Sequence, residues 1–412
     1  MKKLTGPFSQ LLSLADMPLK GAIKDDQLKV ITDGGILTAD GIIIATGHFE
    51  TLRSQHPDAV VEEIKEDYVL LPGFVDCHTH ICFAGSRAKD YNLRIQGKSY
   101  MEIAKAGGGI WDSVTQTRAA DEPALVASLV KRAERHLSEG VTTIEVKSGY
   151  GLSVTEELKQ LRAIKQADGL TKADLISTCL AAHLLPRDFN GDTEAYLNYI
   201  LQELLPIVKK EGLSNRADIF IEENAFGTAA ALKYLTAAKA MGFELTVHAD
   251  QFSTGGLGVA IAMGAVSADH LEASGDREIE LIKDTDTIAV VLPGASLGLG
   301  MPYAPARKLL DAGACLAIAS DWNPGSAPMG DLLLQAALMS AAEKLGTAEV
   351  FAGLTYRATY ALSLSDRGQL KAGMLADMQA YPCSDYREIL YHQGKLKPAK
   401  VWKSGTLIPP IT

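Results

Sequence analysis

From residue 73 onward, short runs of apolar and β-branched residues alternate with longer segments whose apolar residues recur every three or four positions. The short runs are typical of buried parallel strands, and the longer segments are typical of amphipathic helices. Eight strands are predicted, at residues 73–77, 141–147, 174–180, 218–221, 243–247, 266–269, 287–292 and 315–320. Eight parallel strands, each followed by a helix, predict an α/β fold with a closed (β/α)8 barrel of the TIM type.

Local signals mark the ends of the intervening helices. Ser153, with Glu156 three residues later, resembles a capping box before an apolar helical stretch, and Gly169 is a stop signal after it. A doubly wound open sheet is the structural alternative, but no glycine-rich phosphate fingerprint follows the first strand. The barrel is therefore the favoured fold.

Both ends of the chain also have strand patterns. Residues 28–50 contain short apolar runs with Asp-Gly turn sequences at 33–35 and 40–41, and two more runs occupy 368–373 and 376–380. A chain that begins and ends in β structure can pair its two ends in one module. We predict a small β-sandwich built from residues 1–72 and 368–412, and a central barrel at residues 73–367.

Composition narrows the class of protein. The chain has 412 residues, of which 47% are hydrophobic and 22% charged, and this predicts an ordered globular protein with a large core. Its formal charge of -10 and the lack of a basic stripe argue against a nucleic-acid partner. No apolar run reaches the roughly 20 residues of a membrane helix, and residues 1–21 lack a signal-peptide pattern. Five scattered cysteines indicate reduced thiols, so we expect a cytoplasmic protein that acts on a small molecule.

Histidines gather at the predicted strand ends. His78 and His80 end the first strand two residues apart, so both side chains point to one face at the carboxyl end of the barrel, where TIM barrels carry their active sites. Two histidines alone are more often surface or core residues than ligands. Other candidates follow the third, fifth, sixth and eighth strands: His183, His248, His270 and Asp321. The other histidines, which lie away from this set, are interpreted as ordinary: His48, His56, His136 and His392.

Imidazole and carboxylate groups together suit zinc and similar metals, and a catalytic site leaves one position open for water. These residue types at strand ends predict one zinc or iron ion per chain, and they suit both metals equally. The proposed ligands are His78, His80, His248 and Asp321.

Several longer motifs occur in order along the barrel: Gly-Gly-Gly-Ile at 107–110, Glu-Val-Lys-Ser-Gly-Tyr-Gly-Leu at 145–152, His-Ala-Asp-Gln at 248–251, Ser-Ala-Asp-His-Leu-Glu at 267–272 and Ser-Asp-Trp-Asn-Pro-Gly-Ser at 320–326. With the metal-ligand pattern, they resemble the imidazolonepropionase family of the amidohydrolase superfamily. The resemblance implies a homodimer that hydrolyses the ring C–N amide bond of 4-imidazolone-5-propanoate to N-formimidoyl-L-glutamate in histidine degradation.

The resemblance also implies roles for individual residues. It assigns the metal to the four residues named above and catalytic roles to His270, Asp321 and Gln251. It assigns substrate contacts to Arg87, Tyr100, Tyr150, His183, Gln251, Asn323, Gly325 and Ser326. The implied substrate carries a carboxylate arm, which an arginine guanidinium and phenolic hydroxyl groups can bind. His183 can form a hydrogen bond with the ring.

Some of these residues also have ordinary interpretations. Arg87 could be a solvated surface charge, and Tyr100 could be a packing residue. Lys147, at the end of the second strand, is more typical of a structural ion pair than of a carbamate bridging two metals. Family members often have glutamate where this chain has Gln251, which cannot accept a proton at neutral pH. The general base is then Asp321, His270 or the activated water itself.

Two other functions remain open at this stage. The same scaffold could hold a deaminase of another small cyclic amidine, because metal ligands alone do not select a substrate. A carboxylate clamp of Arg87 and Tyr150 argues against a neutral ring as substrate. A non-catalytic metal-binding relative is the third possibility, but such proteins usually lose ligands, and all four are present.

Overall fold

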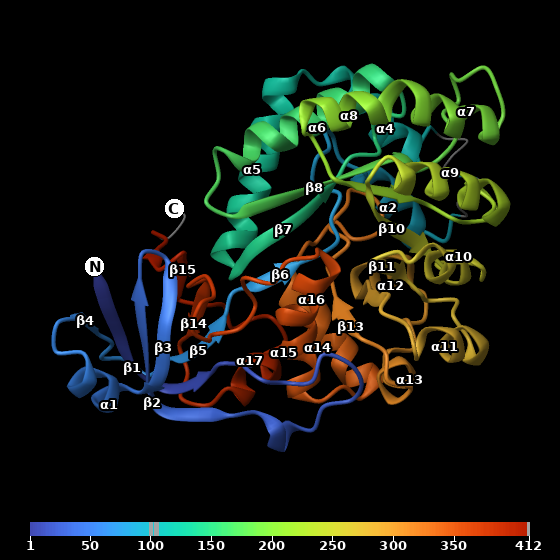
Figure 1. Cartoon of the computed structure of the whole chain (residues 1–412). Coiled ribbons are helices and arrows are strands. Elements are labelled where there is room, and N and C mark those ends of the chain that lie inside the picture. The colour runs from blue at the N-terminus through green and yellow to red at the C-terminus, as the bar shows by residue number, and fades with distance from the viewer. Residues whose placement is uncertain (99–101, 103–106, 410–412) are drawn as a thin grey trace.

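The eight predicted barrel strands form one parallel sheet in chain order in the computed structural model, which describes residues 1–98, 102 and 107–409 (Figure 1). A parallel bridge between Thr79 and Trp322, just beyond the first and last strands, joins the two edges of this sheet. The predicted (β/α)8 barrel is therefore confirmed. Its strands are β6 (Phe74–Asp76), β7 (Val141–Lys147), β8 (Asp174–Ala182), β9 (Arg216–Ile219), β10 (Glu244–Ala249), β11 (Ser267–His270), β12 (Ile288–Val291) and β13 (Leu316–Ile318).

Helices surround this barrel, and one more lies in the β module. Ser153 caps α6 by accepting a hydrogen bond from the Glu156 amide, and α6 ends just before Gly169, as predicted. A short 3-10 turn, Asp25–Gln27, precedes the barrel, and a π-helical turn, Ile200–Leu204, joins α7 to α8. The helices are α1 (Phe49–Gln55), α2 (Ala88–Ile95), α4 (Ile110–Ala119), α5 (Glu122–Ser138), α6 (Val154–Asp168), α7 (Thr193–Tyr199), α8 (Leu205–Glu211), α9 (Thr228–Ala240), α10 (Gly256–Met263), α11 (Asp276–Ile282), α12 (Pro293–Leu299), α13 (Ala306–Asp311), α14 (Leu332–Glu343), α15 (Thr347–Leu354), α16 (Tyr356–Ala361) and α17 (Arg387–Tyr391).

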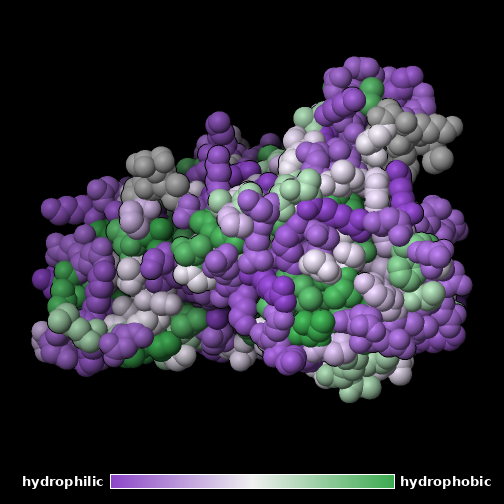
Figure 2. Space-filling model, turned by 90° about the horizontal axis from the view of Figure 1, so that it is seen from above, coloured by the Kyte–Doolittle hydropathy of each residue, from purple (hydrophilic) through white to green (hydrophobic). Residues whose placement is uncertain are grey.

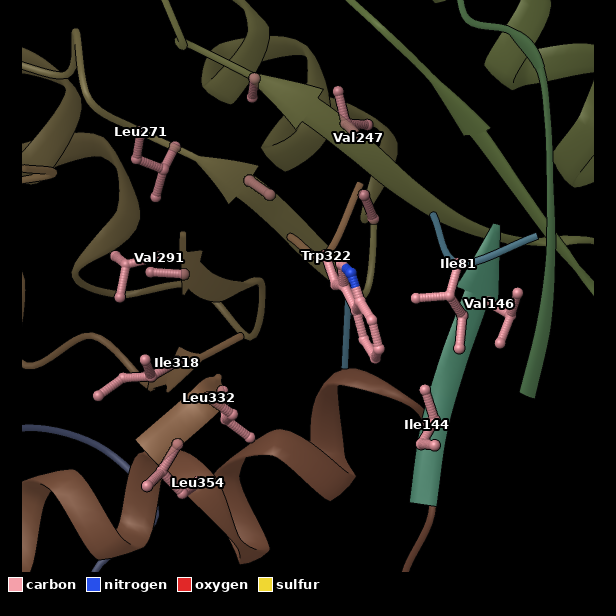
Figure 3. Packing of buried hydrophobic residues seen from close by; sticks show 14 of the residues in the cluster. Ile81, Ile144, Val146, Val247, Leu271, Val291, Ile318, Trp322, Leu332 and Leu354 are labelled. Atoms are coloured by element: carbon pink, nitrogen blue, oxygen red, sulfur yellow. The ribbon is translucent and has the colours of Figure 1, made fainter. Parts of the chain in front are cut away.

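Branched apolar residues build the core that supports the carboxyl end of the barrel. In Figure 3, Ile81 and Val146 lie on one side of the Trp322 ring, and Ile318 and other aliphatic residues lie on the other. All of these side chains are buried. The turn after β13 is thus anchored in the core by Trp322, next to Asp321.

Strands from the two ends of the chain form a second, mixed sheet that lies beside the barrel (Figure 1). The small β module built from both ends of the chain is therefore confirmed. Its strands are joined by hydrogen bonds into one branched sheet, because β1 pairs with three neighbours. The strands are β1 (Lys2–Leu12), β2 (Val30–Ala39), β3 (Ile42–His48), β4 (Val60–Glu63), β5 (Val69–Pro72), β14 (Met378–Tyr381), β15 (Lys400–Lys403) and β16 (Thr406–Leu407).

Two details of the predicted β module are wrong. The Asp-Gly-Gly sequence at 33–35 lies inside β2, where the glycines allow close packing: a Cβ atom on Gly35 would lie 2.9 Å from Phe49 Cα. Residues 368–373 form bends and a turn in place of the predicted strand, and Gly368 and Gly373 both have the positive φ angles that glycine readily adopts. The predicted turn at 40–41 does join β2 to β3.

The face of the molecule seen in Figure 2 is mainly hydrophilic, with hydrophobic residues in separate patches. Among the residues that the structure describes, no helix has the length and apolar character of a membrane span. All five cysteines are free, in agreement with the predicted reduced thiols.

Candidate metal centre

Three imidazole rings converge at the carboxyl end of the barrel. His78 and His80 follow β6, and His248 lies near the end of β10. The Nε2 atom of His80 lies 3.2 Å from Nε2 of His78 and 3.3 Å from Nε2 of His248. Asp321 Oδ1 lies 3.5 Å from His78 Nε2 and 3.4 Å from His80 Nε2. All four side chains are buried.

The spacing of these four atoms fits a metal ion. Four ligands at 2.0–2.1 Å from a tetrahedral zinc ion are separated from one another by about 3.3 Å. The four distances given above, 3.2 to 3.5 Å, agree with this value, and the ligand atoms of the three histidines all lie within 4.8 Å of one another. Two ring nitrogens repel each other at such distances unless a proton or a metal ion lies between them, and a metal ion can replace the proton. The residues present therefore fit a single metal ion.

Two aspartates determine which ring nitrogen faces this point. Asp269 Oδ2 lies 2.7 Å from Nδ1 of His78, and Asp218 Oδ2 lies 3.0 Å from Nδ1 of His248. A carboxylate at Nδ1 holds the proton there and leaves the Nε2 lone pair free for a metal. Because of these carboxylates, His78 and His248 present metal-binding tautomers.

Lys147 joins the two aspartates behind the imidazoles. Its Nζ atom lies 2.8 Å from Glu145, 2.9 Å from Asp218 and 3.7 Å from Asp269, and the side chain is 1% exposed. Burial would lower the pKa of Lys147, but the three carboxylates raise it above its ordinary value. The lysine is therefore an ammonium ion in the buried ion-pair role that the sequence suggested.

The backbone at two strand ends is in a conformation that non-glycine residues rarely adopt. His270 has φ 91° and Asp321 has φ 49°. Such conformations cost about 1 to 3 kcal/mol and cluster at functional sites. They turn the two side chains toward the cavity in front of the imidazoles.

A cavity of about 540 Å³ opens in front of the three imidazoles. It brings together most of the residues proposed from the sequence: His80, Arg87, Tyr150, His183, His248, Gln251, His270, Asp321, Asn323, Gly325 and Ser326. His78 lies behind this surface and is fully buried. Tyr100 lies outside the described residues.

Arg87 is a cavity residue and not a solvated surface charge. Its side chain is 11% exposed, and Nε donates a 2.8 Å hydrogen bond to Asp90. Asp90 also accepts a hydrogen bond from the Gly109 amide, which joins the glycine-rich motif to this position. A Cβ atom on Gly325 would collide with Arg87 Nη1, so glycine leaves room for the guanidinium. Among the residues that the structure describes, the two Nη groups have no hydrogen-bond partner, so they are available for an anionic group in the cavity.

His183 and Tyr150 form the wall beside His80. The His183 ring stacks on His80 with centroids 5.5 Å apart, and Tyr150 lies 5.8 Å from His183. Nδ1 of His183 lies 2.9 Å from the Gly149 carbonyl and so must donate a proton to it. Burial lowers the pKa of His183 to about 4, so the ring is neutral and its Nε2 is an acceptor.

The loop after β13 surrounds Asp321 with donors. Asn323 Nδ2 donates to Asp321 Oδ2 over 2.8 Å, and Ser326 Oγ donates to the same oxygen over 3.2 Å. Asn323 Oδ1 in turn accepts hydrogen bonds from the amides of Gly325 and Ser326. Burial alone would raise the pKa of Asp321, but hydrogen bonds from His78 and His80 hold it well below its usual range. Asp321 is therefore ionised, with Oδ1 directed toward the imidazoles.

Gln251 lies on a loop that Glu222 holds in place. Glu222 Oε2 accepts hydrogen bonds from the amides of Phe252 and Ser253, at 2.9 and 3.2 Å. His270 lies across the cavity, with Nδ1 3.4 Å from Glu272 Oε2 and its ring centroid 5.3 Å from that of His248. The site thus places the ionised carboxylate of Asp321, the amide of Gln251 and the imidazole of His270 around one cavity.

Several cavity residues were missed in the sequence. Glu222 directly follows the fourth predicted strand, so the strand-end rule that found the histidines could also have found it. Arg94 lies on α2 seven residues after Arg87, which is two helical turns, and this spacing was a usable signal. Other cavity residues come from loops without a pattern: Lys98, Asn224, Phe252 and Met301.

Comparisons with known proteins agree with this geometry. The model of the amidohydrolase family matches residues 69–408. The chain is 42% identical over 338 residues to an imidazolonepropionase of Myxococcus xanthus, covering 82% of this chain and 80% of that protein. It is 39% identical over 406 residues to an imidazolonepropionase of Symbiobacterium thermophilum, covering 97% and 95%.

Solved structures share the fold at low sequence identity. Triazine hydrolase from Arthrobacter aurescens superposes with a TM-score of 0.72 at 15% identity, covering 98% of this chain and 94% of that one. An adenosine deaminase from Xanthomonas campestris with bound zinc gives a TM-score of 0.69 at 17% identity, covering 98% and 92%. At such low identity the likeness concerns the fold alone.

Proposed function

The chain belongs to the amidohydrolase family, among its imidazolonepropionases, and from this membership we propose that it opens the ring of 4-imidazolone-5-propanoate by hydrolysis. The product is N-formimidoyl-L-glutamate, an intermediate of histidine degradation. The observation that carries the proposal is that one cavity combines a metal-binding cluster with the guanidinium of Arg87. A ring amide with a carboxylate arm needs both features.

His78, His80, His248 and Asp321 are the residues that would hold the metal, which we propose to be zinc or iron. When bound, the ion supplies a Lewis acid that polarises the ring carbonyl and lowers the pKa of a water molecule toward about 7. The four ligand side chains are buried, which keeps the electrostatic interactions at the reacting atoms strong.

Asp321 is the proposed proton carrier. Its carboxylate is ionised and borders the cavity, so it can accept a proton from the attacking water and deliver it to the leaving ring nitrogen. Asn323 and Ser326 hold Oδ2, and this fixes the orientation of the carboxylate between the metal position and the cavity. His270 borders the same space and would stabilise the tetrahedral oxyanion.

The other polar residues bind the substrate. The Arg87 fork would pair with the propionate arm, with Tyr150 as a second donor, and Nε2 of His183 would accept a hydrogen bond from a ring N–H. Gln251 would orient the substrate or the water by hydrogen bonding, because an amide takes no proton at neutral pH.

A direct test is to incubate the purified enzyme with freshly generated imidazolone propionate and to follow the loss of the ring's ultraviolet absorbance. We expect ring opening, no ammonia release, and N-formimidoyl-L-glutamate as the product by mass spectrometry. Release of ammonia from this or another cyclic amidine, with no ring opening, would favour a deaminase.

The Arg87→Ala variant should bind the substrate more weakly, because a partly buried carboxylate loses its charged partner. We expect a loss of about 2 kcal/mol, or roughly 30-fold in kcat/KM, mainly through a higher KM. Arg87→Lys should recover only part of this loss, because an ammonium ion cannot form two parallel hydrogen bonds. An unchanged KM in Arg87→Ala would place the carboxylate elsewhere.

Gln251→Ala should keep a reduced but measurable rate, within about 10-fold of the wild type, because the site contributes orientation and no proton transfer. Gln251→Glu should stay active and gain or shift an acidic limb in its pH–rate profile, because a nearby metal cation keeps that carboxylate ionised over much of the range. Steady-state rates between pH 5 and 9 test both variants. A Gln251→Ala enzyme with no measurable rate would overturn this assignment.

Metal binding should release a proton. In the metal-free site, burial and Lys147 favour a neutral His78 ring, but hydrogen bonds to Asp269 and Asp321 outweigh them and raise its pKa to about 9. The proton competes with the metal, so the apparent affinity should rise about 10-fold for each pH unit up to this pKa and then level off. Calorimetry in buffers of different ionisation enthalpy measures the released proton. Equal affinity at pH 6 and pH 8 would contradict the expectation.

Two further proposals rest on the family resemblance. We propose that the protein is a homodimer and that it works in the cytoplasm. Light scattering on the purified protein and fractionation of the source cells would test them.

A further inference from the structure

The loop at residues 148–152, which carries Tyr150, is held by side chains of α6. Glu157 accepts hydrogen bonds from the amides of Gly149, Gly151 and Leu152, at 3.1, 2.8 and 2.7 Å. Glu157 is completely buried. A buried carboxylate with three backbone donors fixes the course of this loop.

Gln160, one helical turn after Glu157, holds the centre of the same loop. Its Oε1 accepts a 3.0 Å hydrogen bond from the Tyr150 amide, and its Nε2 donates a 2.7 Å hydrogen bond to the Cys82 carbonyl. The side chain is completely buried. Because both ends of the amide are engaged, its orientation is fixed.

The peptide group between residues 149 and 150 connects Gln160 to His183. Its N–H donates to Gln160, and its carbonyl accepts the hydrogen bond from Nδ1 of His183. Hydrogen bonds on both sides of one peptide group polarise each other. Gln160 therefore orients the Gly149 carbonyl and strengthens it as the acceptor of the hydrogen bond from Nδ1 of His183.

Packing alone leaves the orientation of His183 undetermined. Its ring stacks on His80 at an interplanar angle of 21° and meets the Phe220 ring edge-on. These contacts fix the plane of the imidazole but would hold the flipped ring or the other tautomer equally well. The Gly149 carbonyl distinguishes between these states.

We propose that Gln160 and Glu157 are positioning residues that hold His183 as the Nδ1–H tautomer and so restrict the ring subsite to cyclic amides that offer an N–H donor. The substrate part of this inference rests on the proposed function. An unprotonated Nε2 atom accepts a hydrogen bond from a ring N–H, whereas an N-methylated ring offers it no donor. The two α6 residues would thus act on specificity through a second residue, without touching the substrate.

The decisive experiment compares Gln160→Met with Gln166→Met. Both replace a glutamine of α6, but residue 166 is exposed and serves as the matched control. ¹⁵N NMR of the zinc-loaded enzymes, with His183→Ala used for assignment, reports which nitrogen of His183 carries the proton. We expect Nδ1–H in the wild type and in Gln166→Met, and a mixture of tautomers in Gln160→Met. In kinetics, kcat/KM should fall about 10-fold in Gln160→Met, mainly through KM.

A conservative replacement tests for rescue. Gln160→Glu should behave as the wild type, because a buried neutral carboxyl can accept from the Tyr150 amide and donate to the Cys82 carbonyl. The wild type should also prefer the N–H substrate over its N-methylated analogue, and Gln160→Met should lose most of this preference.

The proposal is overturned if Gln160→Met keeps a single Nδ1–H tautomer and a wild-type KM, or if only kcat changes. If Gln160→Met does not fold, Glu157→Gln serves as the test, since it keeps the side-chain size but replaces an acceptor by a donor. A wild-type tautomer and KM in that variant would also overturn the proposal. The NMR result needs no substrate: an enzyme with Nδ1–H at His183 that leaves imidazolone propionate intact would refute the proposed function and not the positioning role.

Discussion

His248→Ala should lose its metal and its activity together. The variant keeps His78, His80 and Asp321. It lacks the His248 imidazole, which comes from the opposite side of the barrel and whose Nε2 atom lies 3.3 Å from Nε2 of His80. Nδ1 of the same imidazole lies 3.0 Å from Asp218 Oδ2, so Asp218 also loses this partner. Loss of the Lewis acid costs several kcal/mol of transition-state stabilisation, and about 4 kcal/mol corresponds to a rate reduction of about 1000-fold. Metal analysis of dialysed protein, together with the absorbance assay, measures both effects.

His392→Ala is the matched control. His392 is an exposed histidine paired with Glu388 on α17, outside the cavity-lining residues. We expect this variant to keep one metal ion per chain and the wild-type rate. A His248→Ala protein that retained metal and full activity after dialysis would show that the ligand set is wrong.

The sequence predicted the barrel well because its strands are short, apolar and β-branched. The run at 287–292, Thr-Ile-Ala-Val-Val-Leu, is too apolar for a surface strand, so its burial and type were clear. The His-x-His spacing then placed two side chains on one face, since a strand has a period of two residues. Local sequence was therefore sufficient to predict the barrel strands and the shared face of the two histidines.

Contacts between distant strands could not be predicted in the same way. The partners of Lys147 come from its own strand, from β9 and from β11, and only the closed barrel brings all three within 4 Å of its Nζ atom. An aspartate within an apolar strand, such as Asp218 or Asp269, was the available signal, because an unpaired carboxylate is rarely buried. Its partner still depends on strand register, which composition does not reveal.

Glycine caused the clearest errors at the chain ends. Gly34 and Gly35 occur in a turn-like sequence, but a Cβ atom on Gly34 would lie 2.5 Å from Leu11 Cβ in the neighbouring strand. Glycine is required there by a close approach between chain segments and not by a turn. The sequence alone does not distinguish these two uses of glycine.

Asp321→Asn should separate metal binding from catalysis. Asparagine keeps the size of the side chain, and the three imidazoles alone form a cluster that can hold a metal. The amide cannot carry a proton between water and the leaving nitrogen, so we expect kcat to fall by about 100-fold or more. Metal content should stay close to one ion per chain when metal is supplied in excess. Asp284→Asn, at an exposed aspartate, is the matched control and should change neither quantity.

His270→Ala distinguishes the two proposed catalytic roles. If Asp321 transfers the proton and His270 stabilises the oxyanion, each single variant should lose about 100-fold, yet only Asp321→Asn should change the pH dependence of kcat. His270 lies outside the four proposed ligands, although its ring centroid is 5.7 Å from that of His78, so its removal should leave metal content unchanged. Equal pH profiles in the wild type and Asp321→Asn, with a shifted profile in His270→Ala, would reverse the two roles. In that case His270 would be the proton carrier, and Asp321 would serve only to hold the metal.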